Sequence, residues 1–137
     1  MLFHQIEDFS RLHPNARAYT SLGQLRYLSC IQQVDGVVGN SSSGLAEVPS
    51  FKKGTINIGD RQRGRLRANS VIDYEPERQA IAAALSHLFS EDFQRQLPAT
   101  KNPYGDGGAS QSSMKILEKH PLDNLLKKHF YAKKFTA

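Results

Sequence analysis

The sequence holds a single cysteine, Cys30, and no tryptophan among its 137 residues. One thiol excludes a disulfide framework within the chain and a cysteine-rich metal site, and it suits a reducing compartment. The five histidines are scattered, and no two of them are four residues apart, as metal ligands on one helical face would be. We therefore predict no metal site and no cofactor.

The sequence also lacks a long hydrophobic run. No stretch approaches the roughly 18 consecutive apolar residues that span a bilayer, and the first residues lack the basic start and apolar block of a signal peptide. We expect a cytoplasmic protein with no membrane partner. At 137 residues the chain amounts to one domain, too small for two full nucleotide-binding halves.

Lys and Arg outnumber Asp and Glu, and the formal net charge is +5. This excess suits small anionic ligands such as nucleotides, but moderate positive charge is also common in proteins that bind no polyanion. Because the charge is no more than moderate, we predict no nucleic-acid partner.

Strands and helices are predicted to alternate along the chain. Short runs rich in apolar or β-branched residues predict strands at residues 16–20, 36–39, 55–58 and 70–73. Helical periodicity predicts helices at residues 1–12, 24–33, 75–90 and 112–119, and one or two helical turns before Pro49. This order is typical of an α/β fold with a parallel sheet covered by helices.

The predicted helices have recognisable apolar faces. These faces are Leu2, Phe3, Ile6, Phe9 and Leu12 in the first helix, Leu25, Leu28 and Ile31 in the second, and Ile81, Leu85, Leu88 and Phe89 in the helix after Pro76. Residues 121–137 carry Leu122, Leu125, Leu126 and Phe130 among lysines, which predicts a basic amphipathic helix or tail. Such a tail can touch a membrane or a polyanion, but we expect it to pack against its own protein.

The stretch Val37–Glu47 is the most informative one. An apolar run ends in Gly39 and Asn40. Three serines follow, Ser41, Ser42 and Ser43, which we call the serine turn, and the pattern then resumes as a helix at Gly44. An ordinary helix N-cap needs only one hydroxyl, so three hydroxyls with flanking glycines favour a phosphate site at the end of a strand. Glu47 does not fit the spacing of a capping box, which leaves it free to accept hydrogen bonds from a ligand such as a ribose.

The loop at residues 59–67 is rich in arginine. Arg61, Arg63, Arg65 and Arg67 alternate, so an extended loop would place all four on one side, although a solvated basic loop is the other interpretation. Arg61 is nearest the strand, and its planar guanidinium suits a diphosphate. No nucleophile and base pair, paired carboxylates or GxxxxGK[ST] loop occurs, so we predict no catalytic residue in this chain.

Four ordered blocks then resemble the C-terminal domain of the hydrolysing UDP-N-acetylglucosamine 2-epimerases. They are Ser21–Gly23 with Tyr27 and Leu28, Gly39–Gly44 with Glu47, Asn57–Gln62 with Gly64 and Arg65, and Asn102–Gly107. The non-hydrolysing epimerases differ, since they carry an Asp-Ser-Gly-Gly type sequence at the serine turn and lack the Gly-Asp-Arg-Gln block.

The resemblance implies a partial Rossmann-like sheet from the C-terminal half of a GT-B fold, the glycogen phosphorylase type. Residues 1–120 would be an incomplete C-terminal UDP-binding domain, and residues 121–137 the tail. Such enzymes eliminate UDP from UDP-N-acetylglucosamine and hydrate the resulting glycal. They release N-acetylmannosamine for the synthesis of sialic acid or related nonulosonates. The implied ligand is UDP or UDP-N-acetylglucosamine.

Site residues carry over by position. Ser41, Ser42 and Ser43 would hold the diphosphate, Glu47 the ribose, and Ser21 would lie near the uracil. Arg61 and Gln62 would line the nucleotide and sugar side. The complete implied UDP-binding set is Ser21, Asn40, Ser41, Ser42, Ser43, Gly44, Glu47, Arg61 and Gln62.

The family's acid and base carboxylates come from an N-terminal domain that has no counterpart in this sequence, so we expect the chain alone to be inactive. The first two strands of the family's C-terminal domain also have no counterpart here. If the parent sheet has the strand order 3-2-1-4-5-6, the places of those two strands would lie empty between residues 16–20 and residues 36–39. We therefore expect exposed apolar edges and a homo-oligomer, swapped elements or direct pairing of those two strands. The alternative function is a non-catalytic binding or assembly module.

Overall fold

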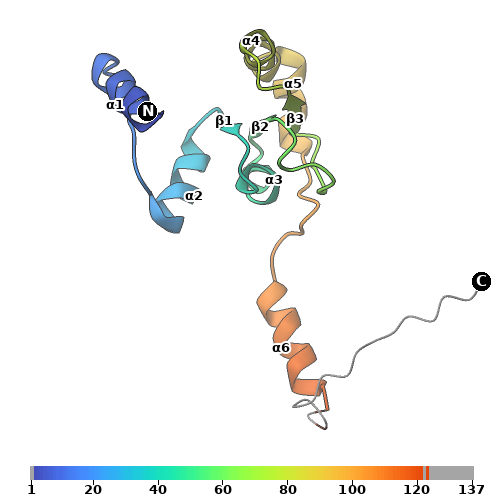
Figure 1. Cartoon of the computed structure of the whole chain (residues 1–137). Helices are drawn as coiled ribbons and strands as arrows, with labels where there is room; N and C mark the ends of the chain where they lie inside the picture. Colours follow the sequence, from blue (N-terminus) through green and yellow to red (C-terminus); the bar gives the residue numbers. More distant parts are fainter. Residues whose placement is uncertain (1, 122, 124–137) are drawn as a thin grey trace, which may run out of the picture. The chain divides into compact units, whose positions relative to one another are not determined.

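The computed structural model describes residues 2–121 and residue 123. The chain divides into one unit that ends at Gly105 and a second that begins at Asp106. The elements of the first unit are α1 (Leu2–Leu12), α2 (Gly23–Gln33), β1 (Gly36–Gly39), α3 (Ser43–Ala46), η1 (Val48–Phe51), β2 (Gly54–Ile58), β3 (Val71–Tyr74), α4 (Arg78–Leu88), α5 (Glu91–Gln96) and η2 (Leu97–Ala99) (Figure 1).

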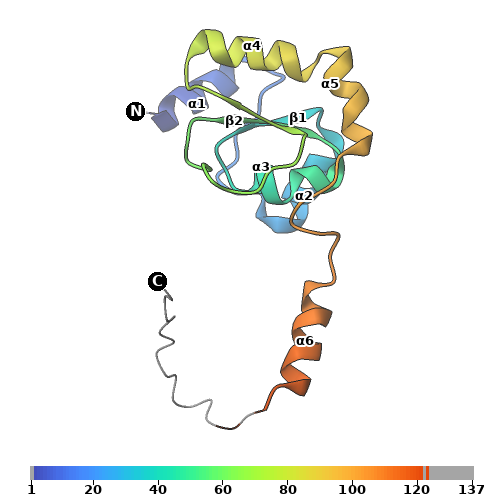
Figure 2. The ribbon, with the colours of Figure 1, turned by 90° about the vertical axis from the view of Figure 1, so that its right-hand side faces the viewer.

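The three strands form one sheet in the order β1-β2-β3, and both pairs are parallel. Helix α4 lies on one face of this sheet, and α3 lies on the other (Figure 2). The predicted α/β class with a parallel sheet and flanking helices is therefore confirmed. Three of the four predicted strands are present at the predicted places, within one residue at their ends.

The central strand β2 is buried on both faces. Ile56 belongs to the main apolar cluster, together with Ala84 and Leu88 of α4 and Phe93 of α5. Thr55 and Asn57 are also buried, at 2% and 1% exposure. Because successive side chains of a strand point to opposite faces, the apolar residue packs under α4 and the polar pair faces the site.

The expected strand at residues 16–20 does not form. This segment is irregular, and Arg17 donates to the carbonyl oxygens of Pro14 and Ala16. A strand needs a neighbour to complete its hydrogen-bond ladder, and within the described residues β1 pairs with β2 alone. The direct pairing of residues 16–20 with β1 is therefore absent from this fold.

Helices α1 and α2 form as predicted, but most of their apolar faces are uncovered. In α1, Phe3 and Leu12 are 79% and 72% exposed. In α2 only Ile31 is buried, and Leu25 is exposed although we predicted it on the buried side. Periodicity predicts which residues share a face, but another element must be present to bury that face.

Helix α4 buries a narrower stripe than predicted. Leu88 and Ala84 are fully buried and Ile81 is half-buried, but Leu85 and Phe89 are exposed. Ala84 and Leu88 both pack in the cluster around Ile56 of β2. Helix α5 was not predicted. Ser90 caps it by accepting a hydrogen bond from the backbone N–H of Phe93, at 3.3 Å.

The second unit contains helix α6 (Ala109–Lys119), which begins three residues before the predicted helix and ends where predicted. Its apolar residues Met114, Ile116 and Leu117 are exposed. The predicted tail helix lies outside the described residues, apart from Pro121 and Asp123. None of the helices in the described part of the chain is long and apolar enough to cross a membrane.

Two leucines of α4 test the position of the core. Leu88→Ala should lower the free energy of unfolding by about 2–5 kcal/mol, because it leaves a cavity under β2. Leu85→Ala, the matched control three residues earlier on the exposed side, should lower it by less than about 1 kcal/mol. Urea denaturation of both variants measures the difference. Equal losses would contradict this packing.

Candidate functional site

The serine turn lies between the carboxyl end of β1 and the first turn of α3. Ser42 occupies the N-cap position but makes no side-chain capping bond. Ser41 Oγ accepts a hydrogen bond from the backbone N–H of Ser43 at 3.4 Å. The ordinary N-cap interpretation therefore fails at Ser42. Because α3 has only four residues, its dipole is small, and the hydroxyls are the main donors of the turn.

Gly44 anchors the turn to the sheet. Its carbonyl oxygen accepts a hydrogen bond from Thr55 Oγ1 at 2.9 Å. A Cβ atom at this position would lie 2.7 Å from Thr55 Cγ2, closer than such atoms approach in proteins. Gly44 is itself buried. Its lack of a side chain therefore allows close approach of the turn to β2.

Ser43 joins Glu47 to α2 through two short hydrogen bonds. Ser43 Oγ donates to Glu47 Oε2 at 2.6 Å, and it lies 2.5 Å from the hydroxyl of Tyr27. Glu47 is outside a capping box, as its spacing indicated, but one of its carboxylate oxygens is already occupied. Within the described residues only Oε2 of Glu47 takes part in a hydrogen bond, so Glu47 can still accept hydrogen bonds from a ligand.

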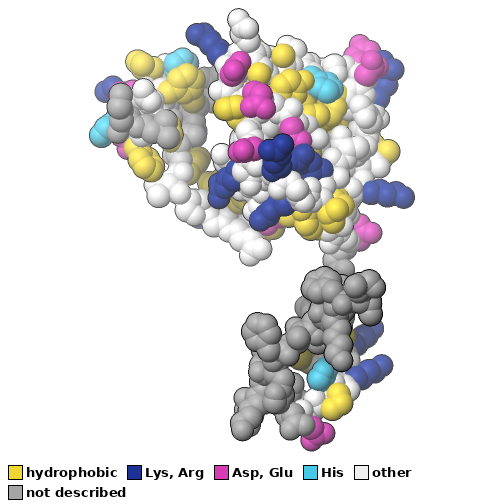
Figure 3. Space-filling view, turned by 45° about the vertical axis from the view of Figure 1, so that its right-hand side comes forward, with side chains coloured by type: hydrophobic (Ala, Val, Ile, Leu, Met, Phe, Trp, Pro, Cys, Tyr) yellow, Lys and Arg dark blue, Asp and Glu magenta, His cyan; other side chains and the backbone are white. Residues whose placement is uncertain are grey.

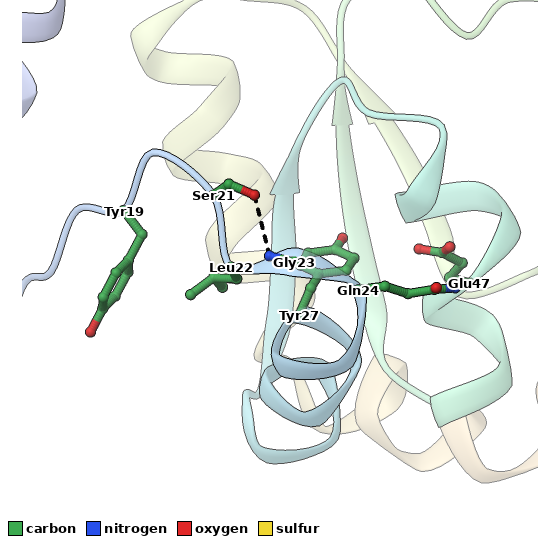
Figure 4. Close-up of a pocket in the computed structure, with 7 residues that line it drawn as sticks. All are labelled: Tyr19, Ser21, Leu22, Gly23, Gln24, Tyr27 and Glu47. Atoms are coloured by element: carbon green, nitrogen blue, oxygen red, sulfur yellow. Dashed lines mark hydrogen bonds between the residues drawn. The ribbon is translucent and has the colours of Figure 1, made fainter.

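A hollow of about 580 Å³ opens beside this group (Figure 4). It brings together two residues of the predicted set, Ser21 and Glu47. Ser21 Oγ accepts a hydrogen bond from the backbone N–H of Gly23 at 3.2 Å. The lining residues are Tyr19, Ser21, Leu22, Gly23, Gln24, Tyr27 and Glu47. Tyr27 was absent from the predicted set, and no local spacing links it to Ser43, which is 16 residues away.

A second group of predicted residues meets around Asn40. The side-chain amide of Gln62 donates to the Asn40 carbonyl oxygen at 2.7 Å, and Arg61 donates to Asn40 Oδ1 at 3.4 Å. Arg61 is exposed, whereas Gln62 is only 3% exposed. Gln62 therefore holds the arginine loop against the serine turn, and Arg61 is the member of the pair that solvent can reach.

The arginine loop is a series of turns and is not extended. The backbone N–H of Arg63 donates to the Asp60 carbonyl oxygen at 2.8 Å, and the backbone N–H of Arg65 donates to the Gln62 carbonyl oxygen at 3.3 Å. These bonds form the turns. The extended conformation that would place all four arginines on one side is therefore not adopted. Arg67 is held by an ion pair with Asp73 of β3 at 2.6 Å.

Asp73 ties the loop to the sheet through both carboxylate oxygens. One accepts from Arg67, and the other accepts from the side-chain amide of Asn57 at 2.6 Å. Arg67 also donates to the Gln62 carbonyl oxygen at 3.3 Å. Since Asn57 and Asp73 are direct partners in the ladder between β2 and β3, the sheet register itself places this polar bridge.

A second hollow of about 490 Å³ lies on the far side of this bridge. Figure 3 shows basic side chains gathered beside acidic ones on one face of the first unit. The lining residues are Gly59, Asp60, Arg63, Arg67, Asp73, Glu75 and Pro76. Its acidic residues offset its two arginines, so the charge of this hollow does not select for an anion as the Arg61 side does.

The loop at residues 102–105 closes around the serine turn and the arginine loop. Asn102 donates from its side-chain amide to the Ala46 carbonyl oxygen at 2.8 Å and to Ser50 Oγ at 2.7 Å. The hydroxyl of Tyr104 donates to the Leu66 carbonyl oxygen at 3.1 Å. These contacts attach a turn-rich block from late in the chain to the end of α3, to η1 and to the arginine loop.

Together the fold and the site define an α/β unit with polar and basic groups at the carboxyl ends of parallel strands, which is where open α/β sheets bind their ligands. A family model described as UDP-N-acetylglucosamine 2-epimerase matches residues 2–118. The match covers most of the chain, which therefore belongs to the UDP-N-acetylglucosamine 2-epimerase family. The partial Rossmann-like sheet is consistent with that family.

Curated relatives carry related names. The chain is 45% identical over 92 residues to the polysialic acid biosynthesis protein P7 of Escherichia coli, which covers 67% of this chain and 24% of that protein. It is 40% identical over 116 residues to the hydrolysing GDP/UDP-N,N'-diacetylbacillosamine 2-epimerase of Campylobacter jejuni. This match covers 84% of this chain and 30% of the relative. It is 34% identical over 112 residues to the hydrolysing UDP-N,N'-diacetylbacillosamine 2-epimerase of Legionella pneumophila. This match covers 80% of this chain and 28% of the relative. Each match thus spans less than a third of the relative's length.

Gly44 and Thr55 provide a paired test of the turn. Gly44→Ala should lower the free energy of unfolding by about 1–2 kcal/mol, because overpacking outweighs the higher helix propensity of alanine. In a Thr55→Ser background, which removes Cγ2 and keeps the hydroxyl, most of this loss should disappear. Denaturation of the four proteins of this cycle measures the coupling. An equal loss in both backgrounds would contradict the contact.

Proposed function

We propose that this chain supplies the UDP-binding part of a hydrolysing epimerase that converts UDP-N-acetylglucosamine to N-acetylmannosamine and UDP. One observation carries the proposal. The stretch from Asn40 to Glu47 follows β1, Arg61 follows the neighbouring parallel strand β2, and the two segments meet where Arg61 donates to Asn40 Oδ1. The family match and the names of the hydrolysing relatives support the same activity.

The proposed ligand runs across this edge of the sheet. The uracil lies near Ser21 in the first hollow, and Glu47 accepts hydrogen bonds from the ribose hydroxyls. The diphosphate lies over Ser41 and Ser42 and faces the guanidinium of Arg61. Two observations support this order: Ser21 and Glu47 line the first hollow, and Arg61 reaches the turn at Asn40.

The donors near the diphosphate would assist departure of UDP. As the bond from the anomeric carbon to the diphosphate oxygen breaks, its electron pair leaves with UDP and negative charge grows on the diphosphate. Fixed hydroxyl, backbone N–H and guanidinium groups stabilise such charge. Removal of the sugar proton at C2 and the later addition of water need acid and base groups, which the resemblance assigns to the family's N-terminal domain.

Titration calorimetry with UDP tests the binding part of this proposal. Arg61→Ala should weaken UDP binding about 10- to 100-fold, and Ser42→Ala about 2- to 10-fold, in line with charged and neutral hydrogen bonds. Arg63→Ala is the matched control, since this arginine lines the second hollow, and it should change binding by less than about twofold. The absence of UDP binding by the unsubstituted chain would contradict the proposal. Release of N-acetylmannosamine by the chain alone would contradict the assignment of the acid and base groups elsewhere.

We also propose that copies of this chain associate through the apolar face of α1. Phe3 and Phe9 are 79% and 56% exposed on that face. Beside them lies a hollow of about 190 Å³, which Ile6 and Tyr19 help to line. An exposed apolar face next to a hollow is typical of an interaction surface.

Sedimentation velocity over a range of concentrations tests the association. The unsubstituted chain should sediment as a dimer or larger species, and the double variant Phe3→Ser, Phe9→Ser should shift toward the monomer because it removes apolar area from the contact. Leu25→Ser is the control, since it removes an equally exposed apolar side chain from α2. A monomer at every concentration would contradict the association.

A further inference from the structure

We propose that Tyr27 and Ser43 are positioning residues that aim Glu47 at the ribose, so that a hydrogen-bond chain from α2 lets the site distinguish ribonucleotides from deoxyribonucleotides. This inference rests on the proposed UDP-binding function and goes beyond it. It assigns a role to Tyr27, and it removes Ser43 from the set of diphosphate ligands.

The direction of the protons along this chain follows from chemistry. An ionised carboxylate only accepts hydrogen bonds, so the single proton of Ser43 Oγ points to Glu47 Oε2, at 2.6 Å. Ser43 Oγ must then act as the acceptor in its 2.5 Å contact with the Tyr27 hydroxyl. Both protons therefore point toward Glu47, and the bond to the charged carboxylate is the stronger of the two.

This arrangement fixes Glu47 at two points. Its backbone N–H donates to the Ser43 carbonyl oxygen at 2.9 Å, and its Oε2 accepts from the Ser43 hydroxyl. A free glutamate side chain loses rotamer freedom when it binds a ligand. A glutamate that is already held loses less, and this preorganisation favours binding.

The remaining carboxylate oxygen suits hydroxyl donors. Within the described residues only Oε2 of Glu47 takes part in a hydrogen bond, so Oε1 is available to a ligand. Figure 4 shows Gln24 and Tyr27 of α2 on the side of the hollow next to Glu47. A ribose offers two neighbouring hydroxyl groups, whereas 2'-deoxyribose offers one. A held acceptor at this place therefore favours the ribose.

The same bonds divide the work among the three serines. Ser43 donates its only hydroxyl proton to Glu47, so it has no proton to donate to a phosphate oxygen. Ser41 and Ser42 are exposed, and neither donates its hydroxyl proton to another described residue in the bonds of the turn. The diphosphate therefore falls to Ser41 and Ser42.

Comparison of UDP with 2'-deoxy-UDP separates positioning from a general structural role. Tyr27→Phe removes one hydroxyl and keeps the ring. We expect it to weaken UDP binding about 2- to 10-fold, as expected for a hydrogen bond of ordinary strength. Binding of 2'-deoxy-UDP should weaken less, because only the 3'-hydroxyl remains to reach Glu47. Ser43→Ala should have the same effect, and the double variant should be no weaker than Ser43→Ala alone. Tyr74→Phe is the matched control, since the Tyr74 hydroxyl contacts His87 and its ring packs against the apolar cluster under α4, and it should change neither affinity.

The carboxylate ¹³C signal of Glu47 provides a measurement that needs no ligand. It should shift in Tyr27→Phe and in Ser43→Ala but not in Tyr74→Phe. An unchanged signal would overturn the hydrogen-bond chain. Equal loss of affinity for both nucleotides in Tyr27→Phe, or no loss for either, would overturn the positioning role while UDP binding itself stands. If the unsubstituted chain binds no UDP, both the proposed function and the ribose role are overturned.

Discussion

The parallel register of the three strands is the constraint on which the site depends. Gly39 pairs with Asn57, and Asn57 pairs with Asp73, so the three strands end side by side. The serine turn leaves β1 and the arginine loop leaves β2 at this common edge. A shift of β2 by one residue would turn Thr55 and Asn57 to the opposite face. It would remove both the bond from Thr55 to Gly44 and the bridge to Asp73.

A polar network then fixes the two loops relative to each other. Gln62 binds the carbonyl oxygen of Asn40, and Asp73 holds Arg67 at the far end of the same loop. The bond from the buried Gln62 side chain helps to specify one geometry, because an unmade bond inside the protein is costly. Arg61 remains the exposed guanidinium beside the turn. The loop thus separates Arg67, which is paired with Asp73, from Arg61, which is exposed beside the turn.

Local signals in the sequence were sufficient for much of this fold. The β-branched run at Thr55 and Ile56 predicted β2, and helical periodicity predicted α1, α2 and α4. The glycines and serines predicted the turn at the end of β1. Local spacing could not predict which faces are covered, so Leu25 and Leu85 were placed inside although they are exposed. The strand at residues 16–20 failed for a similar reason, since its formation requires a neighbouring strand.

The sequence by itself determined the family, the α/β class and the residue types of the site, because these follow from motifs and short-range periodicity. Only the tertiary structure decided how those residues are used. In the folded chain Tyr27 lies beside Ser43, the Ser43 hydroxyl donates to Glu47, and Arg67 forms an ion pair with Asp73. The physical reason is that these bonds join side chains on different elements. Their distances depend on how α2, α3 and the strands pack, which no local spacing along the chain encodes.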